Sequence, residues 1–199
     1  MKAAATKDLF GYWNRLRGAR AAPERSDVDP AAIRGTLADV FILEVDRLAT
    51  FPFRLSGSRI CALTGHEMRG ERFLDLWRGP DRETVRGALD SVSDDAAVAV
   101  VGARGLTELD RRVDLEIALL PLRHRGRTHA RLLGSMAPVE TPYWLGVSPV
   151  TRFELTSLRM IWPSGRRRFR DADPEPSPPP TIRDAGRRIG RFFVFDGGR

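Results

Sequence analysis

The chain has 199 residues, of which 42% are hydrophobic and 30% charged, with a formal net charge of +7. This length accommodates one ordinary domain with appendages but not two large domains. No apolar run approaches the roughly 20 residues that a membrane-spanning helix requires, and the opening residues lack the apolar segment of a secretory signal. The single cysteine, Cys61, excludes an internal disulfide and suits a reducing compartment, so we expect a cytoplasmic protein.

The positive charge is concentrated toward the carboxyl end. Residues 152–199 carry 11 arginines against six acidic residues, whereas the first 151 residues carry 22 basic and 20 acidic residues. Four arginines within residues 166–170 offer contacts to phosphates of a nucleic acid or an anionic surface. Without a recognition helix or a zinc motif, this arginine cluster is weak evidence for nucleic-acid binding. Solvated linker charge is the favoured interpretation, and we do not expect a nucleic-acid partner.

An amphipathic helix is predicted near the start of the chain. Leu9, Trp13 and Leu16 are spaced at i, i+4 and i+7 within residues 8–17. A large aromatic side chain on so short a helix needs tertiary packing, either on its own domain or on a second subunit. The sequence favours neither alternative. Trp13 and Arg17 are therefore candidate interaction residues.

Alternating apolar residues predict strands through the centre of the chain. The predicted strands are residues 40–45, 53–56, 96–103, 113–122 and 129–137. Residues 58–64 and 80–93 have helical spacing instead, and Gly65 closes the first of these helices. Tight turns between the strands, with helices grouped between the second and third, predict an α+β domain. We expect a five-stranded antiparallel sheet with helices packed on one face.

The carboxyl-terminal part of the chain has a different character. Residues 153–162 are expected to form one more extended element, and residues 171–180 are too rich in proline to pack. A short apolar strand at residues 189–195 follows, whose side chains would invite aggregation if they were exposed together. We expect this segment to dock on the domain along a sheet edge, with docking on another protein as the alternative. Phe193 and Arg199 are its candidate interaction residues.

Motifs for enzymatic or metal chemistry are missing from the sequence. There is no phosphate-binding glycine loop and no Gly-x-Ser-x-Gly nucleophile turn. His66, His124 and His129 are scattered, which disfavours a metal site, although the last two could face each other across a hairpin. We therefore predict no catalytic residues and no metal, and an enzyme of unknown class is only a remote alternative.

Several short motifs resemble, in order and spacing, the PAS_5 family of single-domain PAS proteins common in alphaproteobacteria. They are Phe10-Gly11-Tyr12-Trp13, Leu16-Arg17-Gly18, Phe53-Arg54-Leu55-Ser56-Gly57, Phe73-Leu74-Asp75-Leu76-Trp77 and residues 192–199. The resemblance implies a cytoplasmic sensor or adaptor that signals through protein contacts. With the element pattern it implies four regions. They are an N-terminal helical region (1–38), a PAS-like core with one following extended element (39–162), a basic and proline-rich linker (163–185) and a C-terminal apolar segment (186–199).

Some PAS domains bind haem or flavin, and this sequence favours neither a haem site nor a photoactive flavin site. Haem needs an axial ligand, often histidine, which the helix at residues 80–93 lacks. A photoactive flavin site would need a reactive cysteine between asparagine and arginine, whereas Cys61 lies between Ile60 and Ala62. We therefore expect no cofactor. The expected partners are signalling proteins such as a kinase or a regulator, or a second copy in a homodimer.

The alternative is a PAS sensor with an apolar or aromatic ligand in its core pocket. The candidate pocket residues are Cys61, Phe73, Trp77, Leu119 and Met136. Phe73 and Trp77 could line such a pocket, but aromatics at their spacing more often belong to an ordinary core. Core packing is therefore the favoured interpretation.

Overall fold

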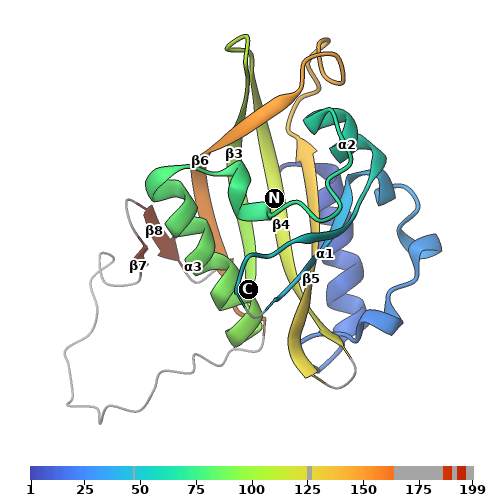
Figure 1. The fold of residues 1–199 in the computed structure, drawn as a ribbon. Helices are drawn as coiled ribbons and strands as arrows, with labels where there is room; N and C mark the ends of the chain where they lie inside the picture. Colours follow the sequence, from blue (N-terminus) through green and yellow to red (C-terminus); the bar gives the residue numbers. More distant parts are fainter. Residues whose placement is uncertain (47, 125–126, 164–185, 190–191, 196–199) are drawn as a thin grey trace.

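The computed structural model describes residues 1–46, 48–124, 127–163, 186–189 and 192–195. An antiparallel sheet of six strands, ordered β2-β1-β5-β4-β3-β6, runs through the molecule (Figure 1). Its strands are β1 (Val40–Glu44), β2 (Phe53–Ser56), β3 (Val98–Thr107), β4 (Arg112–His124), β5 (Arg127–Pro138) and β6 (Val150–Ile161). The α+β class and the antiparallel sheet are confirmed.

The sixth strand corrects the predicted count of five. β6 pairs with β3 along its whole length, so the extended element after the fifth strand belongs to the sheet. A bulge places one additional residue, Thr156, between Leu155 and Ser157 in the register with β3. The buried side chains therefore change phase, from Phe153 and Leu155 to Leu158. That change breaks the period of two by which a strand is recognised in a sequence.

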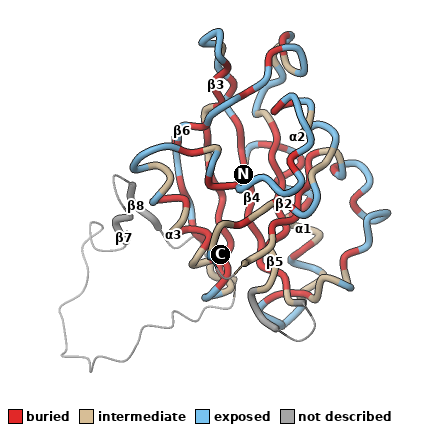
Figure 2. Tube along the Cα trace, in the orientation of Figure 1, coloured by how far each residue is buried: buried red, intermediate tan, exposed pale blue. Residues whose placement is uncertain are grey.

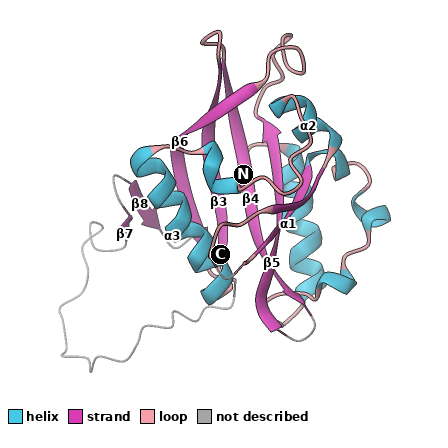
Figure 3. Cartoon of the chain, in the orientation of Figure 1, coloured by secondary structure: helices cyan, strands magenta, loops and turns pink. Residues whose placement is uncertain are grey.

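Helices cover both faces of the sheet. The helices are α1 (Ala4–Arg17), α2 (Ser58–Thr64) and α3 (Gly79–Asp95), with 3-10 turns η1 (Arg25–Asp27), η2 (Pro30–Ile33), η3 (Leu37–Asp39) and η4 (Phe73–Leu76). α2, η4 and α3 lie on one face, as predicted, and α1 lies on the other (Figure 3). Among the described residues, none of the helices has the length and apolar character needed to cross a membrane.

Each face of the sheet has its own apolar cluster, because successive strand residues point to opposite sides. In β5, Leu132 belongs to the cluster under α2 and α3, and Leu133 belongs to the cluster under α1. Burial is consequently continuous along the central strands (Figure 2). A sheet covered on both faces explains why β4 contains the nearly unbroken apolar run from Ile117 to Leu120.

α1 is fixed to the sheet at both ends. Near its C-terminus, Trp13 is fully buried and its Nε1 donates a hydrogen bond to the carbonyl of Pro121 at 2.9 Å. At the other end, the backbone N–H groups of Lys2 and Ala3 donate to the carboxylate of Glu116 over 2.8–3.0 Å. The helix begins four residues before the predicted position because this carboxylate anchors the chain ahead of it.

The C-terminal segment forms a hairpin rather than the single predicted strand. Its strands are β7 (Gly186–Ile189) and β8 (Phe192–Phe195), and among the described residues these two strands pair only with each other. β8 lies beside β6 without joining its sheet (Figure 1). The linker prediction and Arg199 fall outside the described residues. Docking of the segment stays a prediction.

Candidate functional site

The interior between the sheet and the α2–α3 side is filled by aromatic rings in mutual contact. Ring centroids are 5.4 Å apart for Phe41 and Phe53 and 5.8 Å apart for Phe41 and Phe73. The series continues from Phe73 to Trp77 at 6.1 Å and from Trp77 to Phe153 at 5.4 Å. All five side chains are buried. Rings at these separations attract one another, so this series is a packed core.

The structure brings four of the five predicted pocket residues into that core. Leu119 and Met136 are buried in the same apolar cluster as Phe73 and Trp77. Cys61 lies apart, half-buried on α2, with its Sγ 3.2 Å from the Ser56 hydroxyl. The prediction of a shared neighbourhood therefore fails for Cys61. Cys61 directly follows the buried Ile60, and successive residues of a helix point in different directions around its axis, so the thiol lies to the side of the face that meets the core.

One polar atom in the core has no partner. Within the described residues, Trp77 Nε1 is buried and makes no hydrogen bond. Leaving a buried donor unpaired costs about 1–3 kcal/mol. The packing of the indole ring between Phe73 and Phe153 offsets this cost. A bound acceptor atom at this position would remove it.

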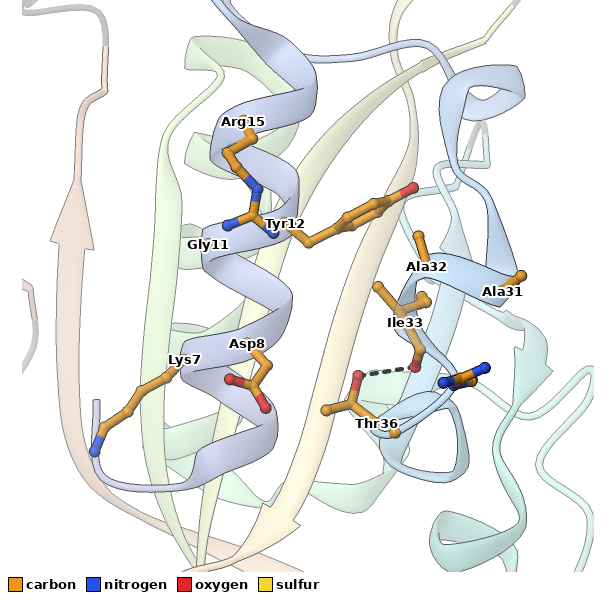
Figure 4. Close-up of a pocket in the computed structure, with 11 residues that line it drawn as sticks. Lys7, Asp8, Gly11, Tyr12, Arg15, Ala31, Ala32, Ile33 and Thr36 are labelled. Atoms are coloured by element: carbon orange, nitrogen blue, oxygen red, sulfur yellow. Dashed lines mark hydrogen bonds between the residues drawn. The ribbon is translucent and has the colours of Figure 1, made fainter.

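A groove of about 560 Å³ lies on the other face of the molecule, between α1 and the η2 segment (Figure 4). Tyr12 reaches across it toward Ala32. The Tyr12 hydroxyl accepts a hydrogen bond from the Asp29 N–H at 2.8 Å, which joins the two walls. Gly11 contributes no side chain to the α1 wall, and the Arg15 guanidinium lies over it, with Nη1 3.6 Å from where a Cβ atom of residue 11 would be.

Local sequence sets the opposite wall of the groove. The Asp29 carboxylate accepts a hydrogen bond from the Ala31 N–H at 2.9 Å, and Pro30 starts the turn with its φ already suited to a helix. Ile33 is buried in the same cluster as Trp13. The cap from Asp29 and the burial of Ile33 thus fix the turn, and its outer residues line the groove.

The groove carries an excess of positive charge. Lys7 and Arg15 line it from α1 and Arg34 lines it from the opposite wall, and Asp8 is the acidic side chain among the lining residues. All four are exposed. We did not predict these residues, although Lys7, Gly11 and Arg15 follow one another at intervals of four on one helical face. Attention to the polar side of the amphipathic pattern would have found them.

The predicted interaction residues lie in different environments. Trp13 is buried against its own sheet, so of its two alternatives the contact within the domain is the one observed. The Arg17 guanidinium lies 5.5 Å from the centre of the Trp13 ring, which covers the indole from solvent. Partial burial lowers the pKa of Arg17. Phe193 lies in β8, and Arg199 is outside the described residues.

Metal-site geometry is not present in the described part of the chain, where no three histidine, cysteine or carboxylate side chains gather. The register across the β4–β5 turn pairs His124 with Arg127. His124 and His129 are therefore not opposite each other in the hairpin, which removes the arrangement that the sequence had left open.

A family profile described as a PAS domain, PAS_5, matches residues 1–137. The chain belongs to this PAS family. The matched range begins before α1, so the helix that carries the groove lies within the family's pattern, whereas β6 and the C-terminal hairpin lie beyond it. No curated protein matches the chain.

Solved structures of light-oxygen-voltage (LOV) proteins are similar to this PAS domain at low identity. The LOV protein of Rhodobacter sphaeroides is 19% identical, with 52% of this chain and 60% of that chain covered and a TM-score of 0.43. The blue-light photoreceptor Aureochrome1 LOV is 16% identical, with 56% and 89% covered and a TM-score of 0.43. The photoreceptor Vivid is 15% identical, with 69% and 99% covered and a TM-score of 0.43. These likenesses are too distant to say what this domain binds.

Proposed function

We propose that this PAS domain is a non-enzymatic, cytoplasmic signalling module that acts by contacting another protein through the groove between α1 and η2. The observation that carries the proposal is the groove itself: an exposed, charged concavity on a helix that is locked to the sheet. The alphaproteobacterial type and the cytoplasmic location rest on the sequence resemblance and composition.

The charge of the groove indicates what kind of surface it favours. Lys7, Arg15 and Arg34 outnumber Asp8, so an acidic segment of a signalling protein, such as a kinase or a regulator, would gain electrostatic attraction there. Because these side chains are exposed, the attraction acts mainly on the association rate and weakens with salt. A second copy of the domain is the other partner that we consider, since α1 is the exposed helix of this face.

Site-specific photocrosslinking in the native cell tests this function. A photoreactive residue at Arg15 should form a discrete protein adduct, and the same residue at Arg159, an exposed arginine on β6, serves as the control. The charge reversal Arg34→Glu should remove the Arg15 adduct. Adducts of equal yield from both positions, or an adduct that survives the reversal, would contradict the groove as the contact surface.

A ligand in the core is the second candidate function, and the unpaired Trp77 Nε1 is the observation that favours it. A small apolar or aromatic compound with an acceptor atom would satisfy this donor inside the aromatic cluster. Mass spectrometry of the denatured protein should then release one compound per chain from the wild type and none from Trp77→Phe, which keeps a ring but lacks the N–H. Absence of any released compound from both proteins would leave the aromatic cluster as core alone.

A further inference from the structure

A separate cavity of about 360 Å³ opens at the rim of the sheet. Five segments supply its walls: residues 3–5 at the start of α1, Asp39 in η3, part of α2, residues 136–138 at the end of β5 and the loop before β6 at residues 141–146. Most of these wall residues are alanine, leucine, methionine, proline or glycine. The cavity lies within the size range of pockets that bind small organic molecules. It shares no lining residue with the groove, and Leu63 and Met136 of its wall belong to the edge of the apolar core.

Besides Thr141, the polar side chains of this rim pocket are an acidic and a basic residue in contact. Asp39, at the end of η3, is 3% exposed, and its Oδ2 accepts a hydrogen bond from Arg59 Nη1 at 2.5 Å. Among the described residues, Arg59 is the only group that hydrogen-bonds to this carboxylate. A carboxylate has about four acceptor positions, so most of those of Asp39 remain free while it is buried.

Arg59 has unused hydrogen-bond donors, just as Asp39 has unused acceptor positions. Its side chain is 62% exposed, and a guanidinium has five N–H donors, of which the ion pair with Asp39 uses one. Burial raises the pKa of Asp39 even though the neighbouring guanidinium opposes the shift, which agrees with a carboxylate that lacks sufficient partners. The pocket thus offers free acceptors and free donors side by side, next to apolar walls.

We propose that the rim pocket binds a free apolar α-amino acid of about leucine size. Its ammonium would donate to the free acceptor positions of Asp39, and its carboxylate would accept from the free donors of Arg59. Its side chain would lie against Leu63, Met136 and the neighbouring alanines. The head group of an α-amino acid holds one positive and one negative group at adjacent carbon atoms, so it matches an adjacent acid and base without adding net charge. A simple amine or a simple acid satisfies only half of this pair.

This inference goes beyond the proposed function, because it assigns a small-molecule ligand to the domain rather than a surface for protein contact. The pocket is walled in part by residues 3–5, which are the N-cap and the first two residues of the groove-bearing helix α1. The same stretch is held by Glu116 through the N–H groups of Lys2 and Ala3. An occupant would therefore touch the start of the helix that presents the groove.

Isothermal titration of the full-length protein with L-leucine, L-methionine and L-phenylalanine tests the proposal. We expect saturable binding of at least one amino acid. 4-Methylpentanoate and 3-methylbutylamine each carry half of the leucine head group and should bind at least ten times more weakly. Equal affinity for leucine and either half-compound would overturn the assignment, and so would the absence of saturable binding for all three amino acids.

Variants then place the site. Ala62→Trp, at an exposed position on α2 that lines the pocket, should abolish binding while circular dichroism shows an unchanged fold. Asp39→Asn should weaken binding at least tenfold, and Arg159→Ala on β6 should leave it unchanged. Undiminished binding by Ala62→Trp would overturn the site even if Asp39→Asn fails to fold. The Arg15 crosslink is scored separately and without added amino acid, so failure of one proposal does not decide the other.

Discussion

Single side chains decide how the N-terminal helix joins the sheet. Glu116 occupies a polar position in the alternating pattern of β4, which in a sheet with one open face would point to solvent. In this fold it is buried, because the chain ahead of α1 crosses over it. A buried carboxylate requires hydrogen-bond donors, and two backbone N–H groups supply them. One residue thereby sets where the helix begins.

Glu116→Gln should loosen this anchor. Glutamine keeps one carboxamide oxygen but turns an NH₂ group toward the N–H donors of Lys2 and Ala3, so the local opening free energy should fall by about 1–3 kcal/mol. Amide hydrogen exchange over residues 2–9 measures the effect. Asp114→Asn, exposed on the same strand, is the control and should leave that exchange unchanged. Equal exchange in Glu116→Gln and the wild type would remove Glu116 as the anchor.

A glycine in β5 makes room for a core ring. A Cβ atom at Gly134 would lie 2.1 Å from Cζ of Phe41, its neighbour across the strand pair. Gly134→Ala should therefore reduce the free energy of unfolding by about 1–3 kcal/mol through overpacking. Gly87→Ala, in α3 with nothing within 4 Å of the added atom, should instead be neutral or stabilising. Urea denaturation compares the two, and equal effects would contradict the steric explanation.

The buried Asp39 makes a pH-dependent contribution to stability. Burial raises the pKa of its carboxyl in the folded state, so the folded protein holds this proton more tightly than the unfolded chain does. This contribution to stability should fall as pH rises from the ordinary aspartate pKa of about 3.9 through the raised value, and then level off. In Asp39→Asn this fall should be missing. Denaturation at a series of pH values compares the proteins, and parallel curves would refute the shift.

At the level of elements, α1 is a structural part of the domain and also presents an exposed side to the groove. One side of it buries Leu9 and Trp13 against β4 and β5, and the other side lines the groove with Lys7 and Arg15. Its attachment depends on packing, because a helix of 14 residues is marginal in isolation. Anything that weakens the buried side should therefore alter the groove.

Trp13→Ala should reduce the free energy of unfolding by about 3–5 kcal/mol, since it removes a fully buried side chain and the hydrogen bond to Pro121. Tyr143→Ala is the matched control. Its ring is 92% exposed, so the change should remain within about 0.5 kcal/mol. Thermal and urea denaturation measure both variants. An unchanged unfolding midpoint in Trp13→Ala would show that α1 contributes nothing to the stability of the sheet.

At the scale of the whole molecule, the outer edge of β6 is partly closed by the chain between η4 and α3. Trp77 forms a backbone bridge to Phe153, and the Leu155 N–H donates to the Asp81 carboxylate at 2.9 Å. These contacts occupy the edge at the β6 bulge, where an open strand would otherwise pair with another chain. The β7–β8 hairpin lies beside the same strand. The hairpin therefore lies near one of the two edge strands of the sheet.

Docking of this hairpin on its own domain predicts slow amide exchange. The amides of Phe193 to Phe195 should exchange more slowly than those of residues 171–180, because pairing and burial protect a docked strand. Hydrogen exchange of the protein alone, followed by mass spectrometry, makes the comparison. Exchange at Phe193 to Phe195 as fast as in residues 171–180 would instead favour a segment that docks on a different protein.

The α+β class, the positions of the first five strands along the chain, the helices α2 and α3, and the resemblance to the PAS family could all be predicted from the sequence. These features follow from local periods of apolar residues and from motifs read in order. β6 was seen as extended but not as part of the sheet, because its bulge shifts the period at Thr156. Four of the pocket candidates share one apolar cluster, since aromatic and apolar side chains gather in the core regardless of topology, and their role as a ligand pocket stays a prediction.

Only the tertiary structure decided which of those residues are exposed and which polar groups meet. Burial of Glu116 depends on the chain crossing from the N-terminus, 113 residues earlier, and the pairing of Asp39 with Arg59 joins segments on either side of two strands. The groove requires α1 and η2 to face each other, which the buried sides of both elements bring about. Such contacts are long-range in the chain. Local periodicity shows which side of each element is apolar, but the partner of each side is set by how the whole chain folds.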